Sequence, residues 1–127
     1  MSGLREISLV IVPVSNQDES IAFYVDKLGL EKRTDQEFGG GMRWVEVYAP
    51  VGTTGVALAL PPPGKEVTPQ QTGITFQTDD IDATHAEFKA AGVDVDAEVM
   101  RMGSPVPDMF SVRDPDGHSL LVVQLVG

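Results

Sequence analysis

Three alternating residues, Trp44, Glu46 and Tyr48, are the side chains of this sequence with the clearest chemical potential. Successive side chains of a strand point to opposite faces, so these three share one face. Two aromatic rings and a carboxylate on one face could stack on a ring system and orient it. If that face lines a concave sheet, Glu46 is the best candidate for a general base. If it is an outer face, the three residues pack under a helix or at a subunit contact, and the sequence leaves both readings open.

The two histidines, His85 and His118, are the residues that could exchange protons near neutral pH. His85 lies on the inward stripe of a predicted helix, which is typical of a packed histidine. His118 follows the turn 114–117, and we expect it to organise that turn. Catalysis would otherwise need a Ser/His/Asp set or a phosphate-binding loop. The sequence has no such set, and the glycines at 39–41 lack the lysine and helix of a phosphate loop.

Methionines form a further group, because their pliable side chains suit surfaces that adapt to irregular ligands. Four of them lie near predicted loops and strand ends: Met42, Met100, Met102 and Met109. They could form the rim of a pocket or simply fill gaps in the core.

Composition limits the classes of partner. The 127 residues carry a net charge of −10, which disfavours nucleic acid and anionic membranes as partners. The chain has no cysteine, so cysteine metal ligands and disulfides are excluded. No apolar run approaches the roughly 18 residues of a membrane span, and the N-terminus does not resemble a signal peptide. We therefore expect a cytoplasmic protein.

An internal repeat organises the elements that must position these residues. Adding 64 to the numbers of Asn16, Asp18 and Ala22 gives Asp80, Asp82 and Ala86. In each copy an apolar strand precedes a helix that ends at glycine, and three strands follow. The predicted strands are 7–14, 31–38, 42–48, 56–60, 74–78, 93–100, 109–113 and 119–125. The first predicted helix is capped by Asn16 or Asp18 and buries Ile21, Tyr24, Val25 and Leu28; the second spans 82–91.

Three segments together resemble the vicinal-oxygen-chelate superfamily of glyoxalases, extradiol dioxygenases and bleomycin-resistance proteins. They run from Val14 to Gly29, from Phe76 to Gly92, and from Arg113 through the Asp-Pro-Asp-Gly turn to Gln124. The resemblance implies an α+β fold in which two tandem βαβββ modules form a cup-shaped mixed sheet with the helices on its outer face. The length predicts a single domain over 1–127, and the repeat divides it into module 1 at about 5–60, a Pro-rich linker at 61–72 and module 2 at about 73–127.

The resemblance also shows where this chain departs from metal-using relatives. Their metal ligands, in the first and last strands of each module, correspond here to Leu9, Ala57, Gly73 and Leu121. None of these side chains can ligate a divalent ion. The sequence therefore predicts a metal-free branch of the superfamily, without metal or cofactor.

Small and apolar side chains on the predicted cup floor leave room for a ligand. The alternative is that they close a small core. The expected ligand-binding residues are Leu9, Ile11, Phe38, Trp44, Glu46, Tyr48, Ala57, Thr75, Met100, Met102, Met109 and Leu121.

We therefore expect a homodimeric binding protein that sequesters an aromatic or polycyclic natural product or antibiotic. The second hypothesis is a metal-independent lyase, isomerase or cyclase that uses Glu46, Asp108 or His118. A glyoxalase- or dioxygenase-like metalloenzyme is the third.

Overall fold

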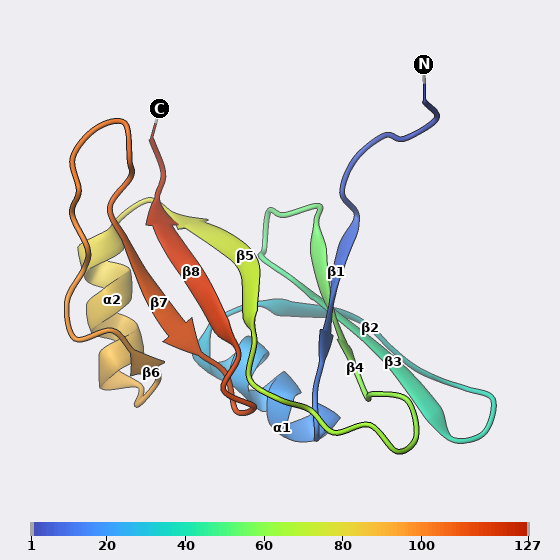
Figure 1. Ribbon diagram of the computed structural model, residues 1–127. Coiled ribbons are helices and arrows are strands. Elements are labelled where there is room, and N and C mark those ends of the chain that lie inside the picture. The colour runs from blue at the N-terminus through green and yellow to red at the C-terminus, as the bar shows by residue number, and fades with distance from the viewer. Residues whose placement is uncertain (1, 127) are drawn as a thin grey trace. The chain divides into compact units, whose positions relative to one another are not determined.

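The computed structural model describes residues 2–126, and its contacts divide the chain into two compact units (Figure 1). The first unit ends at Val67 and the second begins at Thr68. Each unit has its own helix and its own four-stranded sheet. Among residues 2–126, no helix has the length and apolar character needed to cross a membrane.

The first unit has the element order βαβββ. It comprises β1 (Leu9–Pro13), α1 (Gln17–Ile21) continued by the π-helix η1 (Ala22–Lys27), β2 (Glu31–Phe38), β3 (Met42–Tyr48) and β4 (Gly55–Ala59). The strand order is β1-β4-β3-β2; β1 and β4 are parallel and the other neighbours antiparallel.

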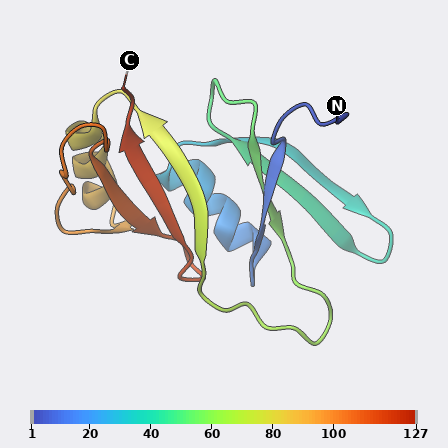
Figure 2. The same ribbon diagram turned by 45° about the horizontal axis from the view of Figure 1, so that its top comes forward.

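The second unit repeats this arrangement. It comprises β5 (Gln71–Thr78), α2 (Ile81–Ala90), β6 (Asp94–Val95), β7 (Met109–Arg113) and β8 (Ser119–Gln124). The order β5-β8-β7-β6 matches that of the first unit, with a parallel β5–β8 pair (Figure 2). The predicted α+β fold of two βαβββ modules is confirmed.

The repeat extends to single hydrogen bonds at the helix ends. The Asn16 side chain accepts a bond from the Glu19 amide at 2.9 Å, and the Asp80 side chain accepts one from the Ala83 amide at 3.0 Å. These N-caps satisfy an amide that has no partner within the helix. Gly29 and Gly92 follow the two helices with φ of 82° and 79°, the left-handed conformation that glycine adopts without strain. Asn16, not Asp18, is therefore the first cap.

Each core lies on one face of a sheet, against the helix of the same unit. On the helix side, the buried strand residues of the first unit are Val12, Val45, Val47, Val56 and Leu58. In the second unit they include Phe110, Val112, Leu120 and Val122, and Ile81 and Phe88 of α2 are also buried. The other face is less covered: Ile11 is 61% exposed there, although Ala57 beside it is fully buried. The strand 7–14 is therefore not covered on both faces, as its continuous apolar run suggested.

The first helix buries Tyr24, as predicted, but its other buried residues differ from those expected. Gln17, Ser20, Phe23 and Tyr24 are buried, whereas Ile21, Val25 and Leu28 are only partly so. From Ala22 onward the helix continues as η1, whose wider turn is closed by a bond from the Leu28 amide to the Phe23 carbonyl. A π-helix rotates the following side chains relative to an α-helical stripe.

The predicted strand 93–100 is shorter in the structure. Only Asp94 and Val95 form β6, and Met100 makes an isolated bridge to Met109. The chain leaves the sheet at Asp96, whose carboxylate accepts a bond from the Ser111 amide at 2.8 Å. This side-chain bond takes the place of a strand-to-strand bond.

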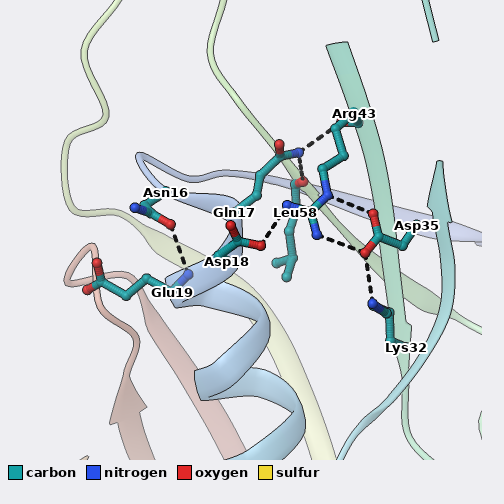
Figure 3. A network of polar contacts seen from close by, with 8 residues as sticks. All are labelled: Asn16, Gln17, Asp18, Glu19, Lys32, Asp35, Arg43 and Leu58. Atoms are coloured by element: carbon teal, nitrogen blue, oxygen red, sulfur yellow. Dashed lines mark hydrogen bonds and ion pairs between the residues drawn. The ribbon is translucent and has the colours of Figure 1, made fainter. Parts of the chain in front are cut away.

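A polar network ties α1 to the sheet of the first unit (Figure 3). The Arg43 guanidinium binds Asp35 through two nitrogens, at 2.7 and 2.8 Å, and Asp18 at 2.7 Å. Lys32 contacts the same Asp35 carboxylate at 2.8 Å. The Gln17 amide nitrogen donates to the carbonyls of Arg43 and Leu58, so α1 is anchored to the backbone of β3 and β4.

Candidate functional site

The face of the first sheet that lies opposite α1 carries most of the predicted ligand-binding residues. One row across the strands pairs Ile11 with Ala57, Ala57 with Glu46, and Glu46 with Thr34. Paired residues share a face, and so do residues two positions along each strand. We call this surface the first open face; its predicted site residues are Leu9, Ile11, Phe38, Trp44, Glu46, Tyr48 and Ala57. Trp44, Glu46 and Tyr48 therefore do not pack under α1, which was one of the alternatives for this strand.

Glu46 is held between its two aromatic neighbours. One carboxylate oxygen accepts a bond from the Trp44 indole nitrogen at 2.6 Å, and the other accepts one from the Tyr48 hydroxyl at 2.7 Å. Both donors are neutral, so they fix the carboxylate without neutralising its charge. The bond to Glu46 raises the pKa of Tyr48, because it favours the protonated phenol.

The Tyr48 ring lies directly over Gly55 on β4. A Cβ atom at Gly55 would lie 2.5 Å from the ring, so any larger residue would displace the ring. The Arg33 guanidinium lies 4.5 Å from the ring centroid, within cation–π range. Arg33 also donates to the carbonyls of Ala49, Pro50 and Gly52, which fixes the following loop.

A hollow of about 480 Å³ lies beside Trp44, within the first unit. It is lined by Thr34, Gln36, Glu37, Phe38 and Trp44. Sequence reasoning named Phe38 and Trp44 but missed the other three. The glycine turn at 39–41 could have indicated them, because a hairpin turn fixes which residues of the two strands are paired. Gly40 and Gly41 have φ of 72° and 77°, and the turn pairs Phe38 with Met42 and Gln36 with Trp44.

The second unit has a matching open face with a smaller hollow. Thr75 pairs with Leu121, and Leu121 pairs with Ser111, so these three share a face. A hollow of about 280 Å³ is lined there by residues that include Gly73, Ser111, Ser119 and Leu121. Gly73 has a φ of 74° within a register shift of β5, and a Cβ at this position would meet open space. The polar residues of this hollow were not predicted.

The four candidate methionines are divided between the two units. Met42 belongs to the first unit and is exposed at the end of the β2–β3 turn. Met100 and Met109 pair through two backbone bonds of 2.7 and 3.0 Å in the second unit. Met102 lies beyond that pair and is exposed.

The sequence profile of the Glyoxalase/Bleomycin resistance protein/Dioxygenase superfamily matches residues 6–122. The chain belongs to this superfamily. Among solved structures, TnmS3, an antibiotic binding protein from Streptomyces sp. CB03234, is 28% identical with a TM-score of 0.83 and covers 99% of this chain and 100% of its own. A superfamily member from Sphaerobacter thermophilus DSM 20745 is 30% identical with a TM-score of 0.85, covering 96% and 98%. YetH of Bacillus subtilis (strain 168) is 28% identical over 120 residues, covering 94% of this chain and 98% of YetH.

The four positions that the resemblance related to metal ligands carry apolar or small side chains in the structure. Leu9 pairs with Gly55, next to Ala57, on the first open face. Leu121 and Gly73 line the hollow of the second. None of these four side chains offers a nitrogen, a carboxylate oxygen or a thiolate.

Among residues 2–126, one group of side chains could ligate a metal ion. It consists of Asp114, Asp116 and His118, whose possible ligand atoms lie within 4.8 Å of one another. One Asp114 oxygen accepts bonds from the amides of Asp116 and His118, at 3.0 and 2.8 Å. The His118 Nδ1 accepts one from the Gln70 amide at 3.1 Å. These bonds organise the turn 114–117 and join it to the start of β5.

His85 is a packed residue of α2. Its Nε2 lies 2.7 Å from the Asp96 carbonyl oxygen, and its ring meets that of Phe110 edge to face at 4.9 Å. The contacts fix the segment that follows β6 against the helix. Both histidines therefore have the structural contacts expected from the sequence.

Proposed function

We propose that this protein binds a small aromatic or polycyclic molecule without a metal and removes it from solution by sequestration, as an antibiotic-resistance protein would. The observation that carries the proposal is the first open face. There Trp44 and Tyr48 are fixed by Glu46 beside a hollow of about 480 Å³. Ligand pockets commonly measure about 300–1,000 Å³ and combine apolar walls with a few fixed polar groups.

The energetics of the face suit a flat ligand. Each well-placed aromatic pair contributes about 0.5–1.5 kcal/mol beyond area burial, and Trp44 and Phe38 both line the hollow. Trp44 loses little rotamer freedom on binding, because its indole nitrogen is already bonded to Glu46. The likeness to the antibiotic binding protein TnmS3, over 99% of this chain, supports an antibiotic as the ligand.

The test uses the single tryptophan, which lies within the proposed site. Anthracycline and anthraquinone antibiotics should quench Trp44 fluorescence with a saturable, one-site curve. Calorimetric titration of Trp44→Phe, which is silent in fluorescence, should show weaker binding. Absence of saturable binding across the panel would contradict the proposal.

A metal-independent lyase, isomerase or cyclase is the second candidate, favoured by the contact between Tyr48 and Glu46. A carboxylate bonded to a phenol could pass a proton to or from a bound substrate. The two functions separate when a ligand that quenches Trp44 is incubated for hours at stoichiometric protein and analysed by mass spectrometry. Sequestration returns the ligand unchanged, whereas catalysis converts it.

A further inference from the structure

We infer that the hollow beside Trp44 selects planar aromatic cations over neutral and anionic rings of the same size. This inference rests on the proposed binding function and names the charge of its ligand. It follows from the electrostatic surroundings of the hollow, which lie wholly within residues 31–48 of the first unit.

Glu46 lies next to the hollow, bonded to the indole of Trp44, and it makes no ion pair with another residue among 2–126. Its two hydrogen bonds come from the neutral groups of Trp44 and Tyr48. Glu37 also borders the hollow, but it pairs with Arg43 in the register and so lies on the face toward α1. A carboxylate offers about four lone-pair positions. Because Glu46 accepts two hydrogen bonds from Trp44 and Tyr48, it can accept a further hydrogen bond from a ligand.

The basic side chains of β2 and β3 already have partners within the first unit. Lys32 and Arg43 bind Asp35, and the register of β3 places Arg43 on the face toward α1. Arg33 pairs with Glu31 and with loop carbonyls, and its guanidinium lies over the Tyr48 ring. An anionic ligand would therefore find these three cations already paired, and it would meet the Glu46 carboxylate.

The aromatic surface adds to the same preference. A cation over a tryptophan face is attracted by the ring quadrupole, more strongly than over phenylalanine or tyrosine. The indole that lines the hollow donates its nitrogen to a carboxylate, which places negative charge at the ring edge. The net charge of −10 raises the local concentration of cationic solutes further.

Three tricyclic probes of similar size test the inference at low ionic strength by calorimetry: 9-aminoacridine, a cation at pH 7, 9-anthracenemethanol, which is neutral, and 9-anthracenecarboxylate. We expect the cation to bind at least about tenfold more tightly than the neutral probe, and the anion to bind most weakly. Salt at about 0.5 M should narrow the gap between cation and anion. Equal affinities, or a preference for the anion, would overturn the inference.

Two matched variants locate the effect. Glu46→Gln should reduce the preference for the cation over the neutral probe to about threefold or less, whereas Glu66→Gln removes the same charge from an exposed residue outside the hollow and should leave it unchanged. An unaltered preference in Glu46→Gln would contradict the role of Glu46. If that variant does not fold, the order of the three probes on the unmodified protein decides. Failure of all three probes to bind would instead count against the proposed function, so the two failures are distinguishable.

Discussion

At the scale of the residue, Gly55 determines whether Tyr48 can reach Glu46. The Tyr48 ring occupies the space in which a Cβ at position 55 would lie, 2.5 Å from the nearest ring atom. Because the glycine gives room for the ring, it also positions the hydroxyl that bonds Glu46. The sequence showed Gly55 only as a loop residue, since nothing local indicates which side chain crosses over it.

Gly55→Ala should therefore lower the free energy of unfolding by about 1–3 kcal/mol, the usual cost of overpacking, and should weaken aromatic ligand binding. Chemical denaturation and Trp44 quenching measure the two effects. Gly39→Ala is the control, because a Cβ there meets nothing within 4 Å and Gly39 is not among the glycines with positive φ. An equal loss of stability in both variants would contradict this role of Gly55.

Tyr48 gives a prediction about alkaline pH. Its pKa is raised by the bond to Glu46, so its folded-state pKa lies above the unfolded value of about 10. The stability that the protonated phenol contributes is present below the unfolded pKa and is lost as the pH rises through the folded pKa. In a spectrophotometric titration of tyrosinate absorbance, Glu46→Gln should shift the Tyr48 transition to lower pH. Tyr48→Phe identifies which transition belongs to this residue, and a shift to higher pH would be the contrary result.

The residue scale shows how far the sequence alone could lead. The alternation of Trp44, Glu46 and Tyr48 predicted a shared face, and β3 has that face. The choice between an open face and a covered one could have been made from Val45 and Val47, the apolar residues between them, which point into the core. The two bonds to Glu46 were not predictable, because they depend on rotamers that only packing selects.

At the scale of the element, the hairpin of β2 and β3 has a polar network on one face and the hollow on the other. Asp35 lies between the guanidinium of Arg43 and the ammonium of Lys32, and the bonds to these two cations hold its pKa well below the usual range. Both faces therefore depend on the same register. The three glycines at 39–41 made this register predictable, whereas the shift between Lys32 and Thr34 had no local signal.

Asp35→Asn should destabilise the protein at pH 7 and matter less in acid. A carboxylate with a depressed folded-state pKa contributes stability above its unfolded pKa of about 3.9, and this contribution is lost as the pH falls through the folded value. The difference in unfolding free energy between the unmodified protein and the variant should thus shrink below about pH 4. Urea denaturation at pH 7 and at pH 3 measures it. Asp26→Asn, which removes a carboxylate that is not in this network, is the control, and a pH-independent difference in Asp35→Asn would contradict the assignment.

The helices show the limit of pattern-based prediction at this scale. The caps at Asn16 and Asp80 followed from residue type and spacing, and the repeat related one to the other. The change to a π-helix at Ala22 did not, because it alters which residues face the core without a distinctive residue type. Phe23, within this π-helix, was missing from the predicted core.

At the scale of the whole molecule, the two units share one element order and one sheet order. This order followed from the 64-residue repeat and from the family resemblance. Whether 1–127 forms a single domain, how the two open faces combine, and whether a partner chain takes part remain predictions.

Leu9→Glu tests whether the first open face binds ligand. Leu9 is half-buried beside Gly55. A desolvated, unpaired carboxylate there should abolish aromatic ligand binding, while the loss of stability stays modest if the face is solvated when empty. Trp44 quenching and thermal denaturation measure both. Ala57→Leu and Thr75→Val are companion variants: if Leu9→Glu fails to fold while these two leave binding untouched, the face is a closed core.

Homodimer formation is the prediction for assembly. Exposed apolar residues on and before β1, including Ile7 and Ile11, are surfaces that a two-fold partner would cover. Sedimentation equilibrium at tens of micromolar (an approximate range in which such dimers persist) should show a dimer. A single monomeric species would contradict it.

The unequal burial of the two sheet faces has a consequence for how such a protein can diverge. The valines and leucines toward the helices hold each unit together, so substitutions there cost stability. Several positions on the opposite face, such as Ile11 and Phe38, are more than half exposed and contribute little to stability. Mutations can accumulate at these positions without unfolding the chain. A lineage could thus change the chemistry of this face while inheriting the same scaffold.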